Sequence, residues 1–97
     1  MPKGYWVTIY RKINDPAKLA RYAELAPKAT SPFGCTYLAR ATASNAYEAG
    51  LKDRIVISEF PSVEKAIEAY NSPGYREALK ALGDGAERDV RIVAGLE

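Results

Sequence analysis

The most constraining feature of this sequence is the order in which two hydrophobic periodicities alternate along it. Strand-like patterns, rich in aromatic and β-branched residues, occupy residues 5–13, 36–41, 54–60 and 89–94. Apolar residues at helical spacing occupy residues 16–26 and the stretch from 63 to 82. The order is therefore strand, helix, strand, strand, helix, strand. It predicts a ferredoxin-like βαββαβ sandwich of the α+β class, in which helices cover one face of an antiparallel sheet.

Serine, aspartate and proline residues mark where the helices should begin and end. Asp15-Pro16 and Ser72-Pro73 each place a capping side chain before a proline at the first helical position. Pro27 should end or kink the first helix, with an irregular continuation toward Phe33-Gly34. The second helical stretch begins after Ser62, and Ser72-Pro73 should divide it into two helices.

Between the second and third strands, residues 42–53 contain turn-forming residues that include Asn45 and Gly50. They predict a long, mobile hairpin loop. With 97 residues, the chain has room for one domain, which we expect to span residues 1–97.

The composition excludes several classes of chemistry. The chain has no histidine and one cysteine, Cys35. Histidine-based triads, histidine metal ligands, haem ligation by histidine and zinc or iron–sulfur cages are therefore ruled out, and we expect neither a metal nor a cofactor. Cys35 has no partner for an internal disulfide, which favours a reducing compartment and predicts a cytoplasmic protein.

Charge and hydropathy give no support to nucleic-acid or membrane partners. The net charge is +2, from fourteen basic and twelve acidic residues with mixed signs along the chain, which gives no reason to expect nucleic acid or an anionic membrane. No apolar run approaches the roughly 20 residues that span a bilayer, and the N-terminus lacks a signal-peptide core. RNA-recognition motifs share this element order, but residues 54–60 lack their basic and aromatic pattern.

The uncovered face of the predicted sheet should be polar in a monomer, yet the first strand is apolar on both faces. One face takes Tyr5, Val7 and Ile9, and the other takes Trp6, Thr8 and Tyr10. Four strands of about six residues, spaced about 4.8 Å apart, make a face of roughly 400 Å². That is comparable with the largest apolar patch of a soluble monomer, about 300–600 Å². We therefore expect a homodimer with Trp6, Thr8 and Tyr10 at its interface.

Four segments together resemble the domain-of-unknown-function 1330 family. They are KGYW at residues 3–6, YAELAP at 22–27, FGCTYLAR at 33–40 and ISEFPSVEKAIEAYNSPGYREAL at 57–79. The resemblance covers roughly residues 3–95, and the last segment is its most specific part. It implies a dimeric α+β barrel and brings no activity with it. We expect Leu96-Glu97 to derive from an expression vector.

Arg40 and Glu59 are candidate site residues because charges are uncommon inside or at the ends of strands. If both point into a cleft, Arg40 could bind a carboxylate or phenolate bidentately. Glu59 could then act as an acid or base with a pKa raised by burial. The alternative is a cross-strand or intersubunit ion pair, or simple exposure at the strand end.

Three tyrosines, Tyr22, Tyr70 and Tyr75, lie on the apolar faces of the predicted helices. Their hydroxyls could converge on a ligand, although an aromatic residue at helical spacing is more often part of the core. Ser72 is a candidate ligand contact, but it has no histidine to activate it and is typical of a helix cap. Cys35 is typical of a small buried apolar residue.

Three functions are compatible with these residues. The first is binding of a small molecule in a cleft between sheet and helices by a homodimer. The second is cofactor-independent oxygenation or isomerisation of a small aromatic or enolisable compound, which rests on analogy between folds. RNA binding is the third and weakest. Whether the protein is an enzyme stays open at this stage.

Overall fold

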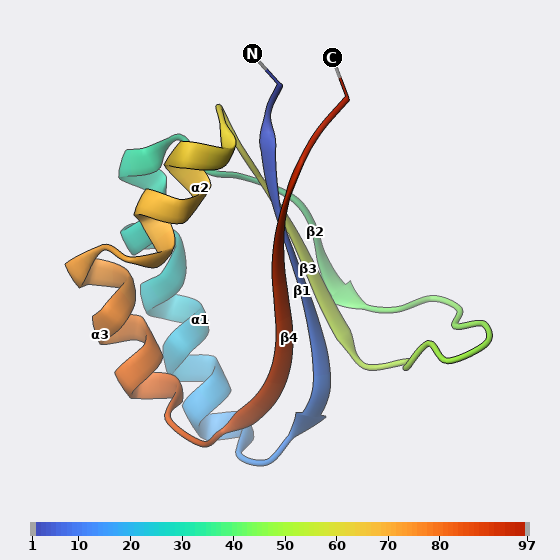
Figure 1. The fold of residues 1–97 in the computed structure, drawn as a ribbon. Coiled ribbons are helices and arrows are strands. Elements are labelled where there is room, and N and C mark those ends of the chain that lie inside the picture. Colours follow the sequence, from blue (N-terminus) through green and yellow to red (C-terminus); the bar gives the residue numbers. More distant parts are fainter. Residues whose placement is uncertain (1, 97) are drawn as a thin grey trace.

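The computed structural model describes residues 2–96, and its elements follow the predicted order (Figure 1). They are β1 (Gly4–Ile13), α1 (Pro16–Thr30), a short 3₁₀ turn η1 (Ser31–Phe33), β2 (Thr36–Thr42), β3 (Arg54–Phe60), α2 (Val63–Tyr70), α3 (Pro73–Leu82) and β4 (Ala86–Ala94). Leu96 is the last residue described, so the prediction for Glu97 lies outside the described residues.

The four strands form one antiparallel sheet in the order β2-β3-β1-β4. The helices lie together on one side of this sheet and leave the other side open (Figure 1). The predicted ferredoxin-like α+β fold is therefore confirmed.

Aromatic side chains fill the space between the helices and the sheet. The ring centroid of Trp6 lies 5.0 Å from that of Phe60 and 5.1 Å from that of Tyr75. The Trp6 indole donates a hydrogen bond to the carbonyl oxygen of Ala66 on α2 at 3.0 Å, so its one polar atom is satisfied inside the core. Small alanines on the facing helices, such as Ala69 and Ala66, let these rings approach the helix backbones.

This packing corrects the predicted dimer interface. Trp6, Thr8 and Tyr10 are 4%, 5% and 1% exposed because they lie under the helices of their own chain. The alternate residues of β1, among them Val7 and Ile9, are less buried and belong to the open face instead. The larger aromatic row lies inside because the gap between a sheet and its helices needs bulky side chains to fill it.

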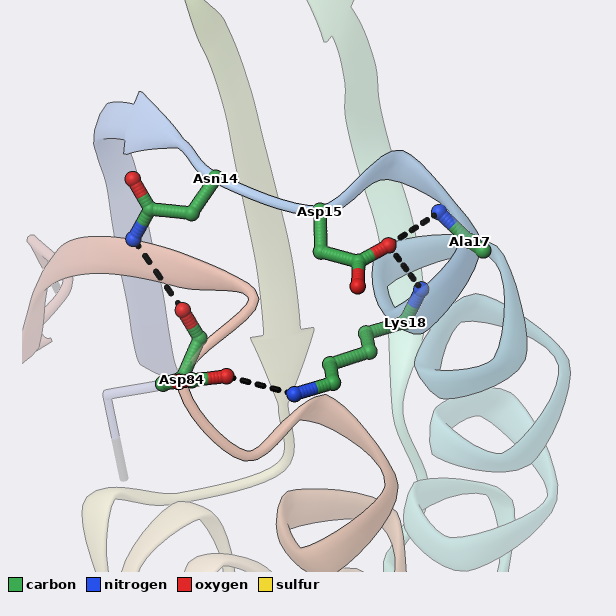
Figure 2. Close-up of polar contacts among 5 residues, drawn as sticks. All are labelled: Asn14, Asp15, Ala17, Lys18 and Asp84. Carbon is green, nitrogen blue, oxygen red and sulfur yellow. Dashed lines mark hydrogen bonds and ion pairs between the residues drawn. The ribbon is translucent and has the colours of Figure 1, made fainter.

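A polar cluster fixes the start of α1 beside the turn between α3 and β4 (Figure 2). Asp15 caps α1 by accepting hydrogen bonds from the backbone amides of Ala17 and Lys18 at 3.0 and 3.3 Å. Lys18 reaches across to the Asp84 carboxylate at 2.5 Å, and Asn14 donates to the Asp84 carbonyl oxygen at 3.0 Å. The hydrogen bond from Lys18 and its charge hold the pKa of Asp84 below its usual value.

The cap-and-proline signals act where they were predicted. Ser62 accepts a hydrogen bond from the backbone amide of Lys65 at the start of α2. Ser72 accepts one from the amide of Tyr75 and donates one to the Ala69 carbonyl oxygen at 2.8 Å, so a single hydroxyl closes α2 and opens α3.

Two boundaries differ from the prediction. The first helix does not end at Pro27 but continues to Thr30, because the proline lies near its end and interrupts few backbone hydrogen bonds. The predicted irregular continuation toward Phe33-Gly34 is the 3₁₀ turn η1. Strand β4 begins at Ala86, three residues earlier than predicted, because the end of β1 extends far enough to pair with it, with Ile13 opposite Ala86.

Residues 43–53 connect β2 to β3 without a helix or strand, as predicted, and project away from the helices (Figure 1). Ile9 and Ile55 on the open face line a hollow of about 530 Å³ together with this loop. Among residues 2–96, no helix is both long enough and apolar enough to cross a bilayer.

Candidate functional site

A small cavity lies between the sheet and α1. All four strands and the helix contribute to its wall, with Trp6, Tyr10 and Val56 from the sheet and Ala23 and Ala26 from α1. Its volume is about 30 Å³, which is room for about two water molecules. Arg40 and Tyr37 lie at the edge strand, where the cavity meets the surface. A larger ligand would therefore have to displace these side chains or extend out between them.

An irregularity in β2 brings Tyr37 and Arg40 to the same wall. The register with β3 shifts between Tyr37 and Ala39, so that Tyr37 faces Ser58 and Arg40 faces Val56. Side chains three positions apart normally point to opposite faces of a strand, and a bulge removes this alternation. The Arg40 guanidinium lies 4.7 Å from the centroid of the Tyr37 ring.

A buried hydrogen-bonded group lies at the inner end of the cavity. Arg88 on β4 donates to the Tyr22 hydroxyl at 3.0 Å, and this hydroxyl lies 2.5 Å from that of Tyr75. Burial raises the pKa of both tyrosines, although the charge of Arg88 opposes the rise. Both hydroxyls therefore stay protonated at neutral pH and can donate or accept hydrogen bonds as neutral groups.

Arg54 enters the cavity from the first residue of β3. Its guanidinium lies 6.0 Å from the centroid of the Tyr10 ring, and that of Arg88 lies 5.6 Å from the same ring. The Nε atom of Arg54 is buried and has no hydrogen-bond partner among the described residues. An unpaired buried donor is unfavourable and needs an acceptor such as a water molecule or a ligand.

The structure separates the two charged residues, for which the sequence left open either a shared cleft or an ion pair at the strand end. Arg40 lines the cavity. Glu59 lies on the open face, where Lys3 binds it at 3.0 Å and the Tyr5 hydroxyl donates to it at 3.3 Å. Glu59 therefore takes the alternative role, an ion pair at the end of a strand.

Of the other candidate residues, one lines the cavity and three do not. Tyr22 lines the cavity, and Tyr75 reaches it only through the Tyr22 hydroxyl. Tyr70 packs in the aromatic core and does not line the cavity. Its ring centroid lies 5.2 Å from that of Tyr75, and the Arg76 guanidinium lies over its ring. Ser72 is a buried helix cap.

Of the residues that line the cavity, sequence reasoning proposed Arg40 and Tyr22, and those it missed include Tyr10, Tyr37, Arg54 and Arg88. Tyr10 was assigned to the wrong face, and Arg88 preceded the predicted fourth strand. Arg54 carried a usable signal, because it begins a strand and lies two positions from Val56, on the same face. Tyr37 depends on the bulge, which the sequence does not reveal.

The cavity has no site for a metal. Within residues 2–96, no group of three or more histidine, cysteine, aspartate or glutamate side chains is placed to hold one. What the cavity does offer is three guanidinium groups, tyrosine hydroxyls and aromatic walls.

The sequence also matches a family model, described as a domain of unknown function (DUF1330), over residues 3–96. The chain belongs to the DUF1330 family. The predicted resemblance is therefore confirmed over nearly its full length. No curated protein matches the sequence.

Three solved structures illustrate the fold of this DUF1330 protein. A protein of unknown function from Rhodopseudomonas palustris has a TM-score of 0.77 at 16% identity, covering 99% of this chain and 84% of its own. The cofactor-independent oxygenase SnoaB from Streptomyces nogalater has a TM-score of 0.69 at 11% identity, covering 100% and 96%. A dimeric ferredoxin-like protein of unknown function from Thermobifida fusca has a TM-score of 0.67 at 18% identity, covering 96% and 91%. These similarities show the shared fold.

Proposed function

We propose that this DUF1330 protein is a homodimer that binds a small molecule in the cavity between the sheet and α1. The observation that carries the proposal is the cavity wall, which combines aromatic rings with polar groups whose hydrogen-bonding capacity is not used up. Ligand sites typically have such a wall, apolar and aromatic with a few polar groups that orient the ligand.

The open face of the sheet supports the dimer. Its apolar side chains come mainly from β1, β2 and β3, with Val93 from β4. Charged groups form ion pairs around them: Lys3 with Glu59 at one end, and Arg91 with Asp89 along edge strand β4, opposite Val7 and Ile9. The apolar residues are Tyr5, Val7, Ile9, Ala39, Ala41, Ile55, Ile57 and Val93. A second copy is the occupant that fits best, because a two-fold axis places an apolar face with charged margins of both signs against an identical one. The related Thermobifida fusca fold is described as dimeric.

Catalysis is a second candidate, favoured by the full-length similarity to a cofactor-independent oxygenase. Arginine and tyrosine donors could stabilise an enolate or phenolate. The cavity wall, however, has no carboxylate to act as a base. Glu59 lies on the other face of the sheet, and the raised pKa of Tyr22 opposes its ionisation. The geometry therefore supports binding better than turnover.

A thermal-shift screen of small metabolites tests the binding proposal. A ligand at a hundred times its Kd should stabilise the protein by about 2.7 kcal/mol, and it should be recovered unchanged. The blocking variant Ala23→Phe fills the cavity wall and should remove the shift. Its control, Ala20→Phe, adds the same ring at an exposed position of the same helix and should keep it.

The outcomes separate the two candidate functions. Chemical conversion of the ligand would establish catalysis in place of simple binding. An equal thermal shift in Ala23→Phe would show that the ligand binds elsewhere and would contradict the proposed site. Absence of any shift across a broad library would overturn the binding proposal itself.

A further inference from the structure

The cavity concentrates positive charge that the chain itself does not neutralise. Arg40, Arg54 and Arg88 come from three different strands and line the same wall, while no aspartate or glutamate lines it. Among the residues that the structure describes, none of the three has a carboxylate within 4.0 Å. Other cations, such as Lys18 and Arg91, do have carboxylate partners.

Neutral groups are the neighbours of these guanidinium ions. Arg40 lies over Tyr37, Arg54 lies near the Tyr10 ring, and Arg88 lies over Tyr22 at 4.8 Å from the ring centroid. An aromatic face attracts a cation but accepts few of its hydrogen bonds. Each arginine carries five N–H donors and keeps its charge in proteins, so most of this capacity is still available.

One donor identifies the inside of the cavity as the place where an acceptor is needed. The Nε atom of Arg54 is buried and unpartnered, while the Tyr22 hydroxyl in the same cavity wall already accepts from Arg88. A carboxylate has two acceptor oxygens in the planar arrangement that matches an arginine fork. It would supply both the missing acceptor and the missing negative charge.

We propose that the cavity selects a small organic carboxylate, an inference that rests on the proposed binding function and names its ligand class. The volume of about 30 Å³ suits a carboxylate head group. The remainder of the molecule would extend past Tyr37 and the exposed Arg40 at the edge strand. A dimer partner on the open face would leave this entrance free, because the cavity lies on the opposite face of the sheet.

Matched acids and amides test the charge preference. Trp6 is the one tryptophan of the chain and lines the cavity, so its fluorescence reports occupancy directly. We expect acetate and benzoate to bind at least tenfold more tightly than acetamide and benzamide of the same shape. A tenfold preference corresponds to about 1.4 kcal/mol. The preference should weaken with added salt.

Arginine variants locate the preference within the molecule. Arg54→Gln should remove most of the difference between acid and amide. If burial makes this variant unstable, Arg40→Gln, at an exposed position, should still weaken binding of the acids. The matched control is Arg76→Gln, because Arg76 is exposed, lies over the Tyr70 ring and does not line the cavity. It should leave both affinities unchanged.

The results that would overturn the inference differ from those that would overturn the proposed function. Amides that bind as tightly as the acids would show a small-molecule site without charge selection. Equal losses in Arg54→Gln and Arg76→Gln would show that the net charge of the protein, and not the cavity, attracts the anion. If no acid or amide alters Trp6 fluorescence, the carboxylate inference fails, and the metabolite screen alone then decides the binding proposal.

Discussion

Among single residues, Tyr22 joins the hydrophobic core to the cavity, because it lines the cavity and its hydroxyl contacts the buried Tyr75. The Tyr22 hydroxyl accepts a hydrogen bond from Arg88 at 3.0 Å and lies 2.5 Å from the Tyr75 hydroxyl. The Tyr22 oxygen therefore links α1 to β4 through Arg88 and to α3 through Tyr75. Tyr22→Phe would leave two buried groups without this partner. Tyr75→Phe would remove one hydrogen bond and leave the Tyr22–Arg88 pair intact.

This asymmetry predicts different stabilities for the two phenylalanine variants. Tyr75→Phe should lower the free energy of unfolding by about 0.5–1.5 kcal/mol, and Tyr22→Phe by about 1–3 kcal/mol, because buried unsatisfied groups cost more than a lost bond. Urea unfolding at one fixed protein concentration measures both. Tyr47→Phe is the control, since Tyr47 is 78% exposed and its loss should change stability by less than about 0.5 kcal/mol. A larger loss in Tyr75→Phe would contradict the assigned network.

The same two tyrosines predict a loss of stability in alkali. Burial raises the pKa of Tyr75 above its ordinary value of 10.0 in the folded chain. Above pH 10.0 the unfolded chain releases the Tyr75 proton while the folded chain keeps it. The folded state then binds more protons than the unfolded state, so the free energy of unfolding falls as pH rises.

Lysine ion pairs also weaken in alkali, so the informative quantity is the difference between wild type and Tyr75→Phe. The stabilising effect of the Tyr75 hydroxyl should be complete well below pH 10.0 and should shrink above it, as urea unfolding across the pH range would show. A difference that stays constant through this range would mean that Tyr75 ionises as freely in the folded chain as in the unfolded one.

At the scale of elements, local signals were sufficient to predict where most segments begin and end. Ser62 and Ser72 cap their helices as predicted, since a cap depends only on residues a few positions away. The third strand was predicted at its observed bounds, Arg54–Phe60. Boundaries set by pairing with a distant strand were less accessible, and β4 accordingly begins before its apolar centre, at Ala86.

The candidate site was less predictable than the fold because it depends on which face of each strand points inward. One bulge brings Tyr37 and Arg40 together, and its register shift is a property of the paired strands. Glu59 and Ser58 are adjacent in sequence, yet Ser58 lines the cavity and Glu59 lies on the open face. An error of one position therefore exchanges a site residue for a surface residue.

At the scale of the whole molecule, both faces of the inner strand β1 are largely apolar, so the sequence pattern of β1 does not reveal which face the helices cover. The glycine at the start of β1 contributes to the answer. A Cβ at Gly4 would lie 2.6 Å from the Ser62 carbonyl oxygen, so the absent side chain lets α2 start close against this face. Because the helices cover the face of Trp6, Thr8 and Tyr10, the opposite face with Tyr5, Val7 and Ile9 is the one available to the proposed partner.

Ile57 is the position that tests the dimer most directly. It lies on inner strand β3, opposite Val7 on one side and Ala39 on the other, at the centre of the open face. Ile57→Lys should leave the folded single chain intact, because this face is not covered by its own helices. In the dimer, however, the substitution would bury an unpaired charge, so we expect it to prevent association.

Light scattering over a concentration series would measure the mass, with two copies expected for wild type and one for Ile57→Lys. The control Ala20→Lys adds the same charge at an exposed position of α1, on the other side of the sheet, and should remain dimeric. Wild type should also melt at a higher temperature as its concentration rises, because dissociation precedes or accompanies unfolding, and Ile57→Lys should lose this dependence. A wild-type protein with the mass of one copy at every concentration would overturn the dimer, whereas a dimeric Ile57→Lys would move the interface away from the open face.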